Sequence, residues 1–195
     1  MGFPAKMTIT HKYAETVNMT STTSSFATYF FTCNGLYDPN LTGTGHQPLY
    51  FDQMSTLYNH YTVVGSRIKV RTAPNTSAED MYFMGCYIND DAVNSYTDSS
   101  GVIENVPGAS TVIVPNNSND LYTLTQNWSA AKAFGARTGI IQNTSLAGSA
   151  SGNPAESQTF CICCQAINAA TVTVTLFVEI EYITVWTERK EIAQS

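Results

Sequence analysis

The chain has 195 residues and a formal net charge of −6; 12% of its residues are charged, 43% are hydrophobic and 11% are aromatic. This hydrophobic content excludes an intrinsically disordered chain, and no apolar run reaches the roughly 18 residues of a membrane-spanning helix. No run of Lys and Arg is longer than two residues, so the sequence lacks the basic block expected of a basic nucleic-acid-binding protein. A low charge content favours a surface that is buried against neighbouring molecules.

Eight segments are rich in Thr, Val and aromatic residues with apolar residues at spacing two, whereas helical patterns are nearly absent. One short helix is expected at Asp52–Asn59, where Asp52 can cap the first turn. The pattern predicts an all-β fold in one domain that spans residues 1–195, as a β-sandwich, a jelly roll or a barrel. The strands are expected at 8–18, 24–34, 60–72, 81–89, 102–114, 120–128, 157–168 and 171–186.

Three of these segments are apolar on both faces: 26–33, 81–88 and 160–164. In a two-layer sandwich one face of each strand should meet water, so these strands need a second cover. Loops of the same chain or another subunit could supply it. Together with the low charge content, this pattern favours a protein that associates.

The five cysteines are odd in number, and residues 1–12 lack the apolar core of a secretion signal, which favours reduced thiols in an intracellular setting. Cys161, Cys163 and Cys164 lie in a strand-like run, which favours buried apolar side chains over a metal or redox site. Calcium binding at a subunit contact by the turn residues Asp38, Asp90 and Asp91 is a less favoured interpretation. We expect no catalytic residues, no metal, no cofactor and no enzymatic activity.

The charged residues of two predicted strands form the one basic constellation. Arg67, Lys69 and Arg71 share one face of strand 60–72, and Glu179 and Glu181 share the polar face of strand 171–186. One interpretation is a ridge that faces nucleic acid. The favoured interpretation is a solvent-exposed strand face whose cations pair with these two glutamates across the sheet.

The stretch YDPNLTGTGHQPLYFDQMSTLYNHYTVVGSRIKV (37–70) resembles the capsid proteins of circular Rep-encoding single-stranded DNA viruses, the circovirus-like group. KAFG (132–135), GNPAESQTF (152–160) and VEIEYITVWTERKEIAQS (178–195) are similar to that group as well. The resemblance implies a single eight-stranded jelly roll with two antiparallel sheets, BIDG and CHEF, named by strand letters in chain order. It further implies self-assembly into a small icosahedral T=1 shell, a virion that encloses a circular DNA genome and assembles inside the host cell, with the nucleus as a candidate compartment.

Proteins of that group usually begin with an Arg- and Lys-rich arm, whereas residues 1–13 hold only Lys6 and Lys12. Sixty chains of charge −6 would give a shell of −360, which repels DNA. We therefore expect genome binding to depend on a basic arm that is missing here. Residues 1–7 should lie on the inner surface of the shell, with Lys6 and Lys12 as the cations nearest to the genome.

Two alternatives stay open. The first is the coat protein of a small positive-strand RNA virus. The second is a jelly-roll carbohydrate-binding module, in which Tyr29 and Phe31 would belong to an exposed aromatic row on one sheet face. No membrane partner is expected for any of these interpretations.

Overall fold

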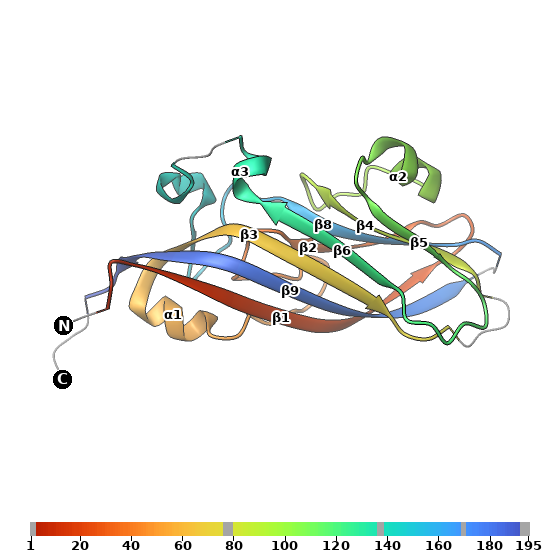
Figure 1. Cartoon of the computed structure of the whole chain (residues 1–195), viewed down its shortest axis with the longest axis horizontal. Coiled ribbons are helices and arrows are strands. Elements are labelled where there is room, and N and C mark those ends of the chain that lie inside the picture. The colour runs from red at the N-terminus through yellow and green to blue at the C-terminus, as the bar shows by residue number, and fades with distance from the viewer. Residues whose placement is uncertain (1–2, 76–79, 136–138, 169–170, 192–195) are drawn as a thin grey trace.

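Two antiparallel β-sheets face each other across a hydrophobic core in the computed structural model, which describes residues 3–75, 80–135, 139–168 and 171–191 (Figure 1). The first sheet has the order β1 (Lys6–Ser21), β9 (Val172–Arg189), β3 (Tyr58–Thr72) and β6 (Thr123–Ser129), with the short β7 (Gly148–Ser149) paired to β3. The second has the order β2 (Ala27–Thr32), β8 (Thr159–Ala166), β4 (Tyr82–Asn89) and β5 (Ser110–Val114).

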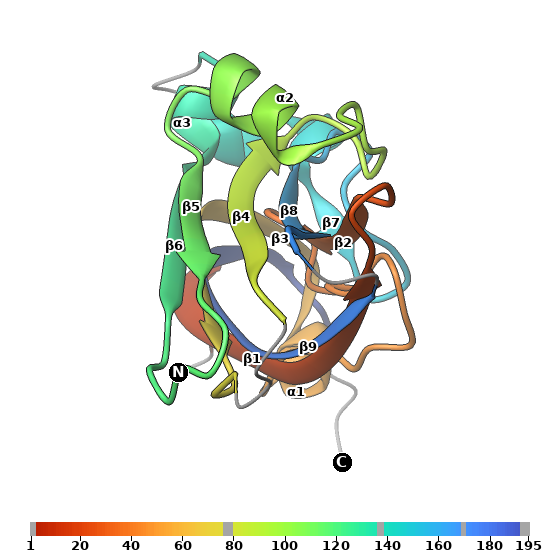
Figure 2. The ribbon, with the colours of Figure 1, turned by 90° about the vertical axis from the view of Figure 1, so that its right-hand side faces the viewer.

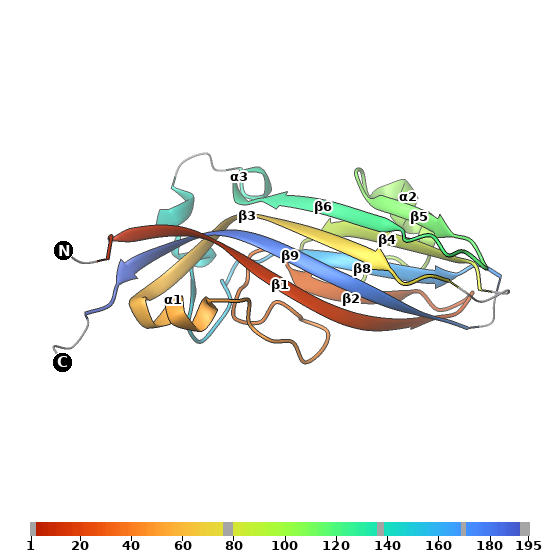
Figure 3. The same ribbon diagram turned by 60° about the horizontal axis from the view of Figure 1, so that its bottom comes forward.

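This strand order is that of a jelly roll. Lettered B to I in chain order without β7, the eight strands form a BIDG sheet and a CHEF sheet, and both expected orders are confirmed. Seven of the eight predicted strands agree with the structure to within three residues at either end. The start of β1 and the end of β9 lie at the same end of the molecule, since Lys6 is paired with Thr187 (Figures 1 and 3).

Helix α1 (Phe51–Leu57) lies where the sequence predicts a helix, at Asp52–Asn59, but the expected cap at Asp52 is wrong. The N-cap position is taken by Tyr50 in the left-handed conformation (φ 69°), so Asp52 lies inside the first turn. Phe51 and Met54 are buried and attach the helix to the core.

The long strand expected at 102–114 is wrong, because helix α2 (Ser99–Asn105) occupies its first part and β5 only its last five residues. Asp98 caps α2: its Oδ1 accepts a hydrogen bond of 2.8 Å from the backbone N–H of Gly101. The expectation of a single helix is also wrong. Three more short helices lie between β6 and β8: α3 (Ala130–Ala133), η1 (Ile140–Gln142) and η2 (Thr144–Leu146).

The core between the sheets is built largely on β9. Its even-numbered residues from Val172 to Trp186 are all buried, whereas most of the odd-numbered ones are exposed to solvent. Each fully buried aliphatic side chain of this kind contributes roughly 1.5–3 kcal/mol. Tyr182 also links the two sheets, because its hydroxyl donates a hydrogen bond of 2.9 Å to the carbonyl oxygen of Thr32 on β2.

The outer face of the CHEF sheet is covered by the chain itself. A second cluster contains Phe30, Phe83, Tyr87, Cys161 and Cys163 from the strands, and the segment that follows β4 packs over them with Val102 of α2 (Figure 2). The expectation that these strands are apolar on both faces is confirmed. Their second cover is an intramolecular loop and helix, so this face needs no other subunit.

Two neighbouring residues of α2 test this cover. Val102 is fully buried in the second cluster, whereas Ile103 is 62% exposed. Val102→Ala should lower the free energy of unfolding by roughly 2 kcal/mol, because two methyl groups leave a packed site. Ile103→Ala should change it by less than about 0.5 kcal/mol. Urea unfolding measures both, and equal losses would contradict the described packing of α2.

His11 joins three parts of the chain at the end where β1 begins. Its ring is fully buried: Nδ1 lies 2.9 Å from the carbonyl oxygen of Leu49, and Nε2 accepts a hydrogen bond of 2.9 Å from the indole N–H of Trp186. With its proton on Nδ1, the neutral ring satisfies both contacts. Protonation of Nε2 would place its N–H against the indole N–H of Trp186, so two donors would face each other without an acceptor. Burial lowers the pKa of His11 below the usual 6.5.

Stability should therefore fall with decreasing pH. The unfolded chain takes up a proton at His11 near pH 6.5, whereas the folded chain does so only at lower pH, so acid favours unfolding through this interval. Urea unfolding between about pH 7.5 and pH 5 measures the decline. His11→Phe should be less stable at neutral pH and should show a smaller decline.

Candidate functional site

The exposed face of the BIDG sheet brings together the charged residues of three strands. β9 lies between β1 and β3, so each of its outward side chains has a partner position on both sides. Glu181 is opposite Lys12 of β1 and Arg67 of β3. Glu179 is opposite Lys69 of β3. Cations and carboxylates therefore alternate across this face.

Two ion pairs form there. Lys12 Nζ lies 3.0 Å from Glu181 Oε1, and the guanidinium of Arg71 contacts the Glu179 carboxylate diagonally across the ladder. Glu181 thus pairs with a cation of β1, and Glu179 with a cation of β3. In the part of the chain that the structure describes, Arg67 and Lys69 have no acidic group within 4.0 Å.

Lys6 and Lys12 lie on the same face as the β3 cations. On β1 the even-numbered residues from Lys6 to Thr20 point outward, and both lysines are exposed. Glu15, by contrast, is on the inward-facing set and binds Tyr13 and Asn40, whose Nδ2 donates a hydrogen bond of 2.7 Å to its carboxylate. The outward face of β1 is therefore purely basic in its charges.

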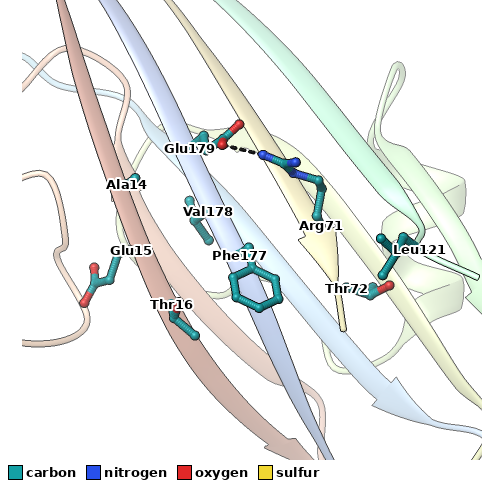
Figure 4. Close-up of a pocket in the computed structure, with 9 residues that line it drawn as sticks. All are labelled: Ala14, Glu15, Thr16, Arg71, Thr72, Leu121, Phe177, Val178 and Glu179. Carbon is teal, nitrogen blue, oxygen red and sulfur yellow. Dashed lines mark hydrogen bonds and ion pairs between the residues drawn. The ribbon is translucent and has the colours of Figure 1, made fainter. Parts of the chain in front are cut away.

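A depression of about 510 Å³ lies at one end of this face (Figure 4). Phe177 of β9 projects into it beside the Arg71–Glu179 ion pair, and Leu121 lines the side next to Arg71 and Thr72. Phe177 is 46% exposed and Leu121 is 63% exposed, so the depression offers water two large apolar side chains.

This depression continues along β9. A second one, of about 320 Å³, shares Ala14 and Glu179 with the first and contains the unpaired Arg67 and Lys69. A third, of about 380 Å³, shares Arg67 with the second and ends at Ile183. We call the three together the β9 groove. From Phe177 to Ile183 it is about 20 Å long, at roughly 3.3 Å per strand residue.

Charge is distributed unevenly over the molecule. β1, β3 and β9 contain six of the nine Lys and Arg residues and four of the fifteen Asp and Glu residues, a balance of +2. The remainder of the sequence therefore carries −8. The four CHEF strands and β6 contain no charged residue. The BIDG face is the basic side of an acidic protein.

Among the described residues, no group of three His, Cys, Asp or Glu side chains is placed to hold a metal ion. All five thiols are free and buried, and burial raises the pKa of Cys161 to about 12, so that thiol stays protonated at neutral pH. His11 is buried against Trp186, His46 stacks on Tyr13 with ring centroids 4.6 Å apart, and the ring of His60 lies 3.2 Å from Glu188.

The aromatic row considered for carbohydrate binding does not exist as expected. Phe31 is fully buried between the sheets, and Tyr29 is half-buried with its hydroxyl accepting a hydrogen bond of 2.9 Å from Asn40 Nδ2. A ring in the core cannot contact a ligand, so Phe31 contradicts this alternative. No helix in the described ranges is long and apolar enough to cross a membrane.

No protein-family model matches the sequence, and no curated protein matches it. Solved viral structures are similar over almost the whole chain. The empty head of Turnip Yellow Mosaic Virus is 11% identical with a TM-score of 0.53, covering 100% of this chain and 88% of that chain. The 60-mer BFDV capsid protein is 12% identical (TM-score 0.51; 99% and 100% covered), and Mud crab tombus-like virus is 9% identical (TM-score 0.52; 98% and 86% covered).

At these identities the similarity establishes the fold: the chain is an all-β jelly roll of the kind found in viral capsid proteins. The similar structures come from several different viruses, so the similarity of fold does not select one group of viruses among them.

The two glutamates of the β9 groove should contribute little to stability. The Lys12–Glu181 pair is largely solvent-exposed, with exposed fractions of 72% and 49%, and water screens such pairs. Glu181→Gln and Glu179→Gln should each change the free energy of unfolding by less than about 1 kcal/mol. Urea unfolding at neutral pH measures this, and a loss above roughly 2 kcal/mol would show that the pairs hold the sheet together.

Proposed function

We propose that the chain is the structural subunit of a viral coat, which self-assembles into an icosahedral shell of sixty copies around a circular single-stranded DNA genome. The observation that carries this proposal is the similarity of fold to capsid proteins over nearly the full length of both chains, including a 60-mer capsid protein. The resemblance of residues 37–70 to the circovirus-like group supports a DNA genome within that class. The proposal assigns the chain no catalytic role and locates it in the virion.

The surface supports repeated association. Large hydrophobic side chains are exposed on strands and loops of the described residues, and contacts between copies would remove them from water. They are Phe3, Tyr37, Leu41, Leu49, Tyr50, Val93, Ile103, Ile113, Leu121, Ile167, Phe177 and Ile183. Because the outer CHEF face is already covered by α2, these side chains and the loops around them are the apolar surface left for neighbours.

Size-exclusion chromatography combined with negative-stain electron microscopy tests assembly. Uniform particles of virus size support the proposal, whereas a monomer of 21.2 kDa at all concentrations contradicts it. Particles produced in cells also separate the two genome types. Encapsidated nucleic acid that DNase degrades after extraction and RNase does not supports the DNA-virus interpretation, and the opposite result supports a coat of a positive-strand RNA virus.

Assembled particles should resist salt. With 12% charged residues and exposed apolar side chains, contacts between copies should rest mainly on apolar burial and neutral polar groups. Salt screens exposed ion pairs but does not weaken apolar burial. Particles should therefore remain intact in about 1 M NaCl at neutral pH. Light scattering measures this, and dissociation into subunits under these conditions would contradict the predicted type of contact.

A further inference from the structure

We propose that the β9 groove binds a single strand of nucleic acid, with Arg67 and Lys69 contacting phosphates and Phe177 stacking on a base. This inference rests on the proposed coat function, in which one surface of the subunit faces the genome. It differs from the expectation that a basic arm alone binds the genome, because the groove lies on the folded domain.

Four cations and three carboxylates line the groove, and one of these carboxylates, Glu15, is bound by Tyr13 and Asn40. Lys12 and Arg71 are each paired with a glutamate, which leaves the charges of Arg67 and Lys69 without an acidic partner among the described residues. Both side chains line the second depression, and Arg67 lines the third as well. A polyanion that follows β9 would meet these two cations without having to break an ion pair.

The apolar part of the groove supports stacking. Proteins that bind single strands without sequence preference combine a basic groove with exposed aromatic rings. Phe177 is 46% exposed on β9 and lies directly opposite Arg71. Two residues further along β9 is Glu179, which lies opposite Lys69. The Phe177 ring therefore lies next to the unpaired cations along the groove. A bound nucleic-acid strand would place a base on this ring while its phosphates contact Arg67 and Lys69.

Charge also favours this face over the other surfaces of the chain as the place where a polyanion binds. Outside β1, β3 and β9 the sequence carries −8, and the CHEF strands carry no charge, so those regions repel or ignore a polyanion. The outward BIDG face has a cationic excess, with five Lys and Arg residues of β1 and β3 against Glu179 and Glu181. A shell of this subunit that contacts its genome through the folded domain would do so here.

Fluorescence anisotropy with a labelled oligothymidylate of about 20 nucleotides tests the inference on the full chain. The double variant Arg67→Gln with Lys69→Gln should bind at least about tenfold more weakly at roughly 50 mM NaCl. Each lost phosphate contact should also reduce the slope of log affinity against log salt by about 0.7. Lys69→Gln alone should also bind more weakly than Lys132→Gln, which makes the same charge change on the exposed surface of α3, away from the groove.

Two further variants test the other parts of the groove. Phe177→Leu keeps an apolar side chain but loses the ring. It should bind oligothymidylate roughly fivefold more weakly than the parent chain does, and it should bind an abasic strand of the same length as tightly as the parent chain. Glu179→Gln with Glu181→Gln frees Arg71 and Lys12 and should tighten binding. The inference would be overturned if the Arg67 and Lys69 variants and Phe177→Leu bound the oligonucleotide as tightly as the Lys132→Gln control does.

The outcomes also separate this inference from the proposed function. If the Arg67 and Lys69 variants stop forming particles while their oligonucleotide affinity is unchanged, the groove is a contact between copies and the inference is wrong. If the parent chain forms no particles but the affinities change as expected, the groove stands and the coat function is wrong.

Discussion

The alternation of side chains along β9 is the constraint on which both the core and the exposed groove depend. Even-numbered residues such as Ile180 and Tyr182 fill the space between the sheets, and odd-numbered residues such as Glu179 and Glu181 point to solvent. A shift of one residue in register would exchange the two sets and bury carboxylates in an apolar core. β1 pairs with β9 along its whole length and β3 pairs from the other side, so this register is held twice.

The cover on the CHEF sheet keeps the apolar outer side chains of its strands out of water within the single chain. Its strands have hydrophobic side chains on both faces, and α2 with the segment around it closes the outer face through Val102. Fully buried residues such as Cys161 and Cys163 then act as small hydrophobic side chains, with thiols whose pKa is raised by burial. Contacts between copies in the proposed shell would therefore use side chains that stay exposed, including Ile103 of α2 and Ile113 of β5.

Residue patterns alone predicted strand positions well, because alternation along a sheet with one exposed face is a strong local signal. The order of the strands came from the resemblance of residues 37–70 and could not follow from alternation, since strands far apart in sequence pair in a jelly roll. α2 was missed because Val102, Ile103 and Val106 fit either a strand or one buried helical turn. Short helices such as α3 depend on tertiary contacts more than on local sequence.

The site was predictable in part for the same reason. Spacing of two placed Arg67, Lys69 and Arg71 on one face, and the neighbouring position of β9 brought Glu179 beside them. The sequence could not show that Glu181 pairs with Lys12, because that depends on β1 being the other neighbour of β9. Phe177 was missed as a groove residue, although its position among the odd-numbered polar residues of an alternating strand was a usable signal.

The two faces of the molecule are chemically different, and this difference would orient the subunit in the proposed shell. The CHEF strands are uncharged and α2 packs over their outer face, whereas β1, β3 and β9 of the BIDG sheet contain six of the nine basic residues. Exposed pairs such as Lys12–Glu181 add little to stability, so their effect is mainly on the local charge. Glu179 and Glu181 each neutralise one cation and leave Arg67 and Lys69 in excess. A face of this kind suits weak, reversible contact with a polyanion, because its local positive charge attracts phosphates although the net charge of the chain is negative.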